Sequence, residues 1–130
     1  MAKDSLDFEA VRAIAREFED LEEGTTFGSP AIKLGKRLVA CMAIHRSAEP
    51  GSLVVRTDFE QRADFLKEDP ETYYLTAHYE NHPVVLVRLA RLQREQLRDL
   101  LAAGRQFVMR HAAQLEKKRR SPRRKTDGLR

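Results

Sequence analysis

The chain has 130 residues, of which 42% are hydrophobic and 34% are charged. This balance is typical of a globular protein with one hydrophobic core, and we predict a single domain over residues 1–114. No apolar run approaches the roughly 20 residues that a membrane-spanning helix needs, which argues against a membrane protein. We expect a cytoplasmic location, because the first residues lack the apolar segment of a secretory signal and the one cysteine, Cys41, cannot form an internal disulfide.

The basic pI of about 9.5 arises at one end of the chain. Residues 1–114 carry 16 basic and 18 acidic residues, a net charge of −2, whereas residues 115–130 carry 8 basic and 2 acidic residues, a net charge of +6. Residues 115–130 combine this charge with no apolar periodicity. We therefore expect a frayed helix that passes into a disordered basic tail.

The first predicted element is a helix that begins after Ser5 or Asp7, since either side chain can accept a bond from a free backbone N–H. Its apolar face extends to Leu21, and Gly24 is a plausible stop. A turn-rich loop then covers residues 24–30, with Phe27 expected to fold onto the core.

Strands and helices alternate through the middle of the chain. Strands are predicted over residues 31–34 and 37–44, joined by a tight turn at Gly35-Lys36, and over residues 53–56. A second helix covers residues 58–69, with Asp58 as its cap. A second strand pair covers residues 73–76 and 84–89. The apolar run in the second of these strands indicates that this strand has a central position in the sheet.

The last helix begins near Arg94. Gly104 lies inside it, where glycine costs roughly 1 kcal/mol relative to alanine, so a close packing contact would explain it. The element order is then α-β-β-β-α-β-β-α. Because hairpins pair neighbouring strands, this order predicts an α+β fold, an antiparallel sheet with packed helices.

A turn rich in aromatic and imidazole rings follows the second helix; its candidate ligand or partner residues are Tyr73, His78, Tyr79 and His82. On a helix the two histidines would share one face, as metal ligation requires, but Pro83 favours a loop and no carboxylate set completes a site. We therefore predict no metal and no cofactor. A hydrogen-bonded turn and a surface that grips a partner or ligand both fit these residues.

Cations gather in two places. Lys33, Lys36 and Arg37 cluster at the first hairpin, either as a solvated tip or as a wing that lies along a DNA duplex. The tail can make non-specific phosphate contacts, which weaken steeply with salt, through Lys117, Lys118, Arg119, Arg120, Arg123, Arg124 and Lys125. The hydroxyls of residues 25–30 could hold a phosphate, although a rigid connection between helix and strand is the favoured interpretation.

Two segments carry a resemblance to a known family: Glu22–Met42, EEGTTFGSPAIKLGKRLVACM, and Thr72–Leu89, TYYLTAHYENHPVVLVRL. The chain resembles the MmcQ/YjbR proteins, small bacterial proteins described as DNA-binding from the shape of their members. The resemblance extends from about Phe8 to Ala112. It implies "double wing" hairpins and an overall shape similar to that of type III secretion chaperones.

Gly28, Pro30 and Lys33 match the pattern of the MmcQ/YjbR family residue by residue. Many family members also carry a tryptophan just after the Tyr/His turn, whereas this chain has no tryptophan and Pro83 or Val84 stands about there.

These observations predict a non-enzymatic binding module. No Ser-His-Asp order, Gly-rich dinucleotide loop or pair of carboxylates in an apolar pocket can be identified, and Cys41 is predicted to be a buried thiol on a strand. The first hypothesis is weak, sequence-tolerant DNA binding through the hairpin wings and the basic tail. The alternative is a protein–protein interaction or chaperone-like module that uses the Tyr/His turn, and a third is an undetected ligand role for that same turn.

Overall fold

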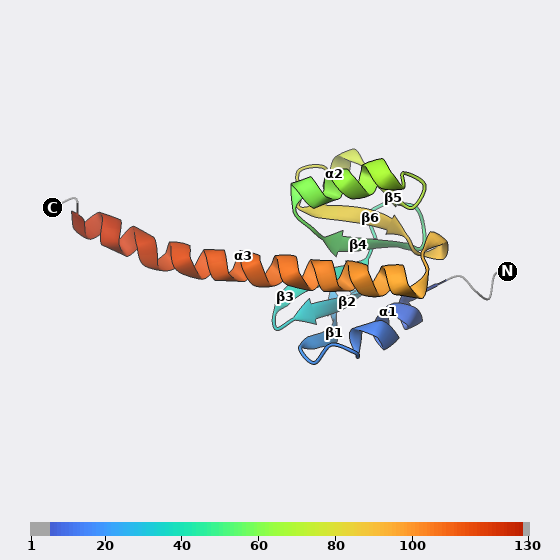
Figure 1. The fold of residues 1–130 in the computed structure, drawn as a ribbon, viewed down its shortest axis with the longest axis horizontal. Coiled ribbons are helices and arrows are strands. Elements are labelled where there is room, and N and C mark those ends of the chain that lie inside the picture. The colour runs from blue at the N-terminus through green and yellow to red at the C-terminus, as the bar shows by residue number, and fades with distance from the viewer. Residues whose placement is uncertain (1–5, 129–130) are drawn as a thin grey trace.

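The computed structural model describes residues 6–128, with side chains as far as Lys117. This part of the chain forms three α-helices and a six-stranded antiparallel sheet of order β1-β2-β3-β4-β6-β5 (Figure 1), which confirms the predicted α+β class. In chain order the elements are α1 (Phe8–Ala15), β1 (Leu21–Thr26), β2 (Ser29–Leu34), β3 (Arg37–Met42), β4 (Ser52–Arg56), α2 (Phe59–Glu68), β5 (Tyr73–Tyr74), the 3-10 helix η2 (Ala77–Tyr79), β6 (Val84–Arg88), the 3-10 helix η3 (Leu89–Arg91) and α3 (Arg94–Gly128). None of the helices between residues 6 and 128 is long and apolar enough to cross a bilayer.

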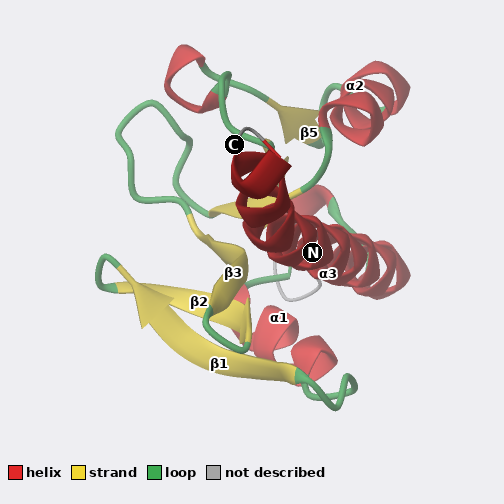
Figure 2. Cartoon of the chain, turned by 90° about the vertical axis from the view of Figure 1, so that its left-hand side faces the viewer, coloured by secondary structure: helices red, strands yellow, loops and turns green. Residues whose placement is uncertain are grey.

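The three α-helices lie on one side of the sheet, and loops lie on the other (Figure 2). Successive strand residues point to opposite faces, so the core divides in two. On the helix-covered face, residues such as Ile32, Leu53 and Val85 pack with α1 and α3. On the opposite face a smaller cluster is built around Cys41 and Leu86, and its members come from strands, loops and η2 and not from any α-helix.

Strand β1 is the element that the sequence did not predict. The first helix ends at Ala15, five residues separate it from β1, which begins at Leu21, and Gly24 lies in the middle of that strand. Only Leu21 of β1 is buried, so the strand lacks the alternating apolar pattern by which strands are recognised. Backbone pairing with β2 holds this edge strand in place, with Gly24 opposite Ala31.

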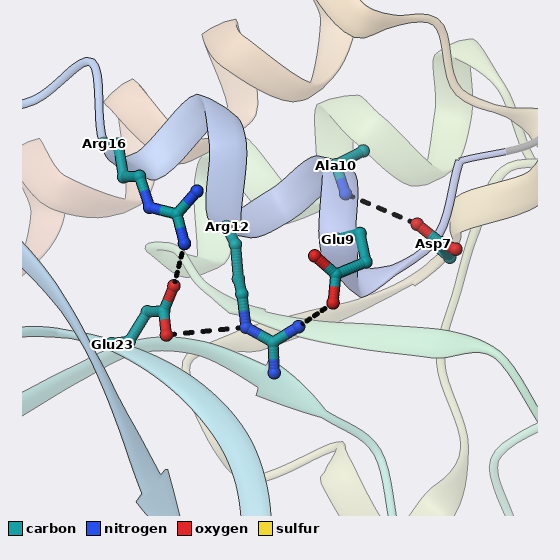
Figure 3. Close-up of polar contacts among 6 residues, drawn as sticks. All are labelled: Asp7, Glu9, Ala10, Arg12, Arg16 and Glu23. Atoms are coloured by element: carbon teal, nitrogen blue, oxygen red, sulfur yellow. Dashed lines mark hydrogen bonds and ion pairs between the residues drawn. The ribbon is translucent and has the colours of Figure 1, made fainter.

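Ion pairs join α1 to β1 (Figure 3). Asp7 caps the helix as predicted, because its side chain accepts a bond from the backbone N–H of Ala10 at 3.3 Å. Arg12 contacts both Glu9 and Glu23, and Arg16 reaches Glu23 at 3.0 Å. Exposed pairs of this kind each contribute about 0–1 kcal/mol, so they orient the edge strand more than they stabilise the fold.

The remaining predicted elements are found close to their expected positions. Asp58 caps α2, and Gly35 has a φ of +64° in the β2–β3 turn, where its lack of a Cβ is needed. Residues 84–87 of β6 are all buried, as expected for a strand flanked by β4 and β5. Helix α3 begins at Arg94 and continues to Gly128. The described backbone therefore shows no break at residue 114, and the disordered tail stays a prediction.

Gly104 of α3 lies directly against the sheet, as the sequence suggested. A Cβ added there would lie 3.2 Å from Cγ1 of Val39, 3.2 Å from Cγ1 of Val55 and 3.3 Å from the carbonyl oxygen of Arg56. Both valines are fully buried on β3 and β4, so neither has space to move.

We expect Gly104→Ala to lower the free energy of unfolding by about 1 kcal/mol. Overpacking costs about 1–3 kcal/mol and outweighs the roughly 1 kcal/mol that alanine contributes through helix propensity. Urea denaturation measures the change, with Gln106→Ala on the exposed side of α3 as a control that is expected to be nearly neutral. A Gly104→Ala protein more stable than the natural one would contradict the close packing.

Candidate functional site

A pocket of about 700 Å³ opens on the helix-free face of the sheet. It is lined by the β1–β2 turn, the ends of β3 and β4, the residues after β3, and the segment from η2 to the start of β6. Most of the lining is apolar, with Met42, Ile44, Val54 and Val84 among the contributors. Its volume lies within the range of about 300–1,000 Å³ that is typical of sites for small molecules.

The predicted Tyr/His turn forms one wall of this pocket. His78 of η2 stacks on His45, with ring centroids 3.5 Å apart, and Tyr79 meets both rings edge-on. His82 also lines the pocket. His45 was not predicted as a site residue, because it lies 33 positions from His78 in the sequence and no motif links the two residues.

Tyr73 does not belong to this cluster, although the sequence placed it among the partner-facing residues. It is 8% exposed and stacks on Phe65 at 4.7 Å on the helix-covered face. Strand alternation instead directs the next residue, Tyr74, to the helix-free side. There its hydroxyl accepts a bond from the backbone N–H of Glu49 at 2.8 Å and contacts Ser52 Oγ.

Phe27 stands at the rim of the pocket, contrary to the expectation that it folds onto the core. Its side chain is 93% exposed and its φ is +50° in the two-residue turn between β1 and β2. A bulky residue in the left-handed region is rare and costs roughly 1–2 kcal/mol. A two-residue hairpin turn of this type requires a positive φ at both of its residues, so the turn itself holds the Phe27 ring in this exposed position. Ile44, 63% exposed, adds a second apolar side chain that lines the pocket.

The hydroxyls of residues 25–30, singled out as a possible phosphate site, lie on a β-hairpin. These residues end β1, form the turn and begin β2, and the Ser29 hydroxyl donates a bond to the backbone oxygen of Met42 at 2.7 Å. Ser29 is 2% exposed, so its hydroxyl joins β2 to the end of β3. The connection is therefore a hairpin between two strands and not the helix-to-strand connection favoured from the sequence.

Cys41 lines the floor of the pocket. It is 9% exposed on β3, as predicted, and burial raises the pKa of its thiol to about 11. The thiol therefore stays protonated at neutral pH and does not act as a nucleophile there. In the described part of the chain, no three His, Cys, Asp or Glu side chains are grouped so that they could hold a metal ion.

Arg56 lies at the edge of the pocket, at the end of β4. Its guanidinium carbon is 5.1 Å from the centre of the Phe107 ring, a cation–π distance. Burial and the nearby charge of Arg37 lower the pKa of Arg56. Among the described side chains, Arg56 Nε is the buried polar atom for which no hydrogen-bond partner is found.

None of the predicted nucleic-acid residues whose side chains the structure describes lines the pocket. Lys36 and Arg37 are exposed at the β2–β3 turn, and Lys33 is half-buried, with its stem beside Gly24. Lys117 is exposed on α3. The side chains of Lys118, Arg119, Arg120, Arg123, Arg124 and Lys125 lie outside the described residues.

Comparison with known proteins identifies the fold. No protein-family model matches the chain, and no curated protein matches it in sequence. The structure is similar to that of Deinococcus radiodurans protein DR2400, which contains a DUF419 domain, with a TM-score of 0.63 and 20% identity over 83% of this chain and 82% of the other. At this level of identity the similarity shows a shared fold.

The contact between His45 and η2 predicts a dependence of stability on pH. Burial, His78 and Arg46 lower the pKa of His45 from its ordinary value of 6.5. The backbone N–H of Ser47 also donates to His45 Nδ1 at 3.1 Å, a bond that only the neutral ring accepts. The unfolded state therefore binds the proton more tightly than the folded state does.

We expect the stability of the protein to be highest above about pH 6.5 and to fall as the pH drops through the lowered pKa of His45. Urea denaturation between pH 5 and pH 8 measures this change. The fall should be smaller in His45→Gln and unchanged in His111→Gln, whose ring stacks on Phe107 outside the pocket. An identical slope in His45→Gln and the natural protein would contradict the expectation.

Proposed function

We propose that this protein is a non-enzymatic binding module of the MmcQ/YjbR type and that it binds an apolar ligand in the pocket on the helix-free face of its sheet. The observation that carries the proposal is the open apolar pocket itself. A sheet face without helices normally presents polar side chains to water. Here Val54 and Val84 line a cavity with the Tyr/His turn as one wall.

The rim of the pocket supports the proposal independently. Phe27 and Ile44 leave large apolar surfaces exposed beside an apolar cavity, and such patches mark binding sites. An apolar side chain of a partner protein offers the same chemistry as a small molecule, so the predicted interaction module is a variant of this proposal.

The first experiment uses the single thiol as a reporter. Cys41 lines the pocket, so a bound apolar molecule should slow its reaction with a small thiol reagent at pH 9. We expect decanol to protect Cys41 in the natural protein.

Phe27→Asn should weaken the protection by decanol severalfold and raise the free energy of unfolding by about 1 kcal/mol, because asparagine tolerates the left-handed region. The matched control is Phe59→Asn, which removes another exposed phenylalanine from α2 and should leave protection unchanged. Equal losses in both variants, or no protection of the natural protein, would count against the pocket.

A second candidate function is weak, sequence-tolerant DNA binding. The positions of the cations that have no ion-pair partner favour it. Six arginines form ion pairs with carboxylates on the body: Arg12, Arg16, Arg88, Arg91, Arg98 and Arg105. Lys36 and Arg37, by contrast, are exposed at a hairpin tip, and no described carboxylate pairs with them. Helix α3 carries the basic sequence after Leu115 away from the sheet (Figure 1).

We expect Lys36→Glu with Arg37→Glu to weaken DNA binding and to reduce the slope of log affinity against log salt by about 2, since each phosphate contact contributes about 0.9. Fluorescence anisotropy of the full chain at several salt concentrations measures the slope. Lys67→Glu with Arg94→Glu, the same charge change on α2 and at the start of α3, should alter the slope much less. Equal effects of the two pairs would show that only net charge matters.

A further inference from the structure

Arg56 differs from the described arginines that form ion pairs with acidic residues. No hydrogen bond or ion pair to a described residue satisfies its guanidinium, and its Nε is buried without a partner. A buried, unsatisfied donor on a charged group is costly, by about 1–3 kcal/mol or more, so such groups are normally paired. Nε itself is covered by protein atoms, but Arg56 lines the pocket, so its two terminal nitrogens are the donors available to a ligand.

The pocket contains nothing that would oppose an anion. None of the described residues that line it is an aspartate, a glutamate or a lysine. Its ionisable members are Arg56, three histidines, Tyr79 and the protonated Cys41. Arg37 adds a second positive charge close to Arg56. The site is therefore apolar over most of its surface and electropositive at one edge.

We propose that the pocket binds a small apolar monocarboxylate, with its hydrocarbon part against Val54 and Val84 and its carboxylate on the guanidinium of Arg56. This inference rests on the proposed function of the pocket. A guanidinium presents two parallel N–H donors that match the two oxygens of a carboxylate. The site has one guanidinium, which lies over the ring of Phe107, and one guanidinium matches a ligand with a single negative charge.

The surrounding sheet favours a small molecule over a peptide. The floor of the pocket is formed by β3, β4 and β6, which are interior strands of the sheet. Beside the two residues of β6 that β5 pairs, Arg62 donates to the carbonyl oxygen of Val84 at 3.3 Å and so occupies that edge. An extended peptide that binds by adding a strand needs a free edge, which these strands do not offer. A small carboxylate requires only the apolar cavity and the guanidinium.

The test compares three ligands of one chain length at pH 8: decanoate, decanol and decylamine. Binding to the full-length protein is measured by calorimetry and by protection of Cys41. We expect decanoate to bind about tenfold more tightly than decanol, because a charged hydrogen-bonded pair is added, and decylamine to bind more weakly than either. Arg56→Met, which keeps an apolar stem, should reduce the affinity for decanoate to that for decanol.

Retained decanol binding shows that Arg56→Met is folded and that its pocket is intact. Arg94→Met, at the exposed start of α3, is the matched control and should leave all three affinities unchanged. Equal affinities for decanoate and decanol in the natural protein would overturn the proposed recognition of a carboxylate, but would leave the pocket as a site for apolar ligands. Binding of none of the three ligands would instead overturn the proposed function. Tighter binding of an acidic, apolar peptide than of decanoate would identify a protein partner and would overturn the proposal that the ligand is a small molecule.

Discussion

The close contact between α3 and the sheet at Gly104 determines how the two faces of this protein are used. With no Cβ at this position, the helix backbone approaches Val39 and Val55 directly. A long helix held this closely covers the middle of the sheet, and α1 and α2 pack beside it on the same face (Figure 1). The chain has no further α-helix in its described part to cover the opposite face. That face is closed only by loops and η2, and a pocket is left between them.

The pocket is held in shape by contacts that connect separate loops. The stacked rings of His45 and His78 join the residues after β3 to those around η2, as does the hydrogen bond of 2.8 Å between Ser47 Oγ and Thr76 Oγ1. Ser29 fastens the β1–β2 hairpin to the end of β3. A cavity whose walls are tied together in this way is largely formed before a ligand arrives, which lowers the entropic cost of binding.

The sequence predicted most of the fold because most elements carry local signals. Asp7 and Asp58 cap helices, Gly35 marks a tight turn, and the apolar run of β6 indicates a central strand. Strand β1 was missed because an exposed edge strand is held by backbone pairing, which leaves no apolar pattern in the sequence.

The site was harder to predict than the fold. His78, Tyr79 and His82 were singled out correctly as neighbours, since they are close in sequence. The side of the sheet that Tyr73 faces depends on the register of its strand. A shift of one residue exchanges the two faces, and composition does not show which register applies. His45 and Arg56 join the pocket through tertiary packing alone. Phe27 was not predicted as a site residue, because an aromatic residue in a turn is normally expected to be buried and nothing local indicates a positive φ.

The measurement that tests the central claim most directly is an NMR titration of the isotope-labelled full-length protein with decanol. Amide shifts should concentrate at residues 26–29, 41–45, 54–56 and 78–84, which line the helix-free face. Amides of α1 and of residues 94–104 in α3, which lie on the other side of the sheet, should stay unchanged. Shifts confined to the helical side, or spread evenly over the chain, would contradict the account of a single apolar site on the open face.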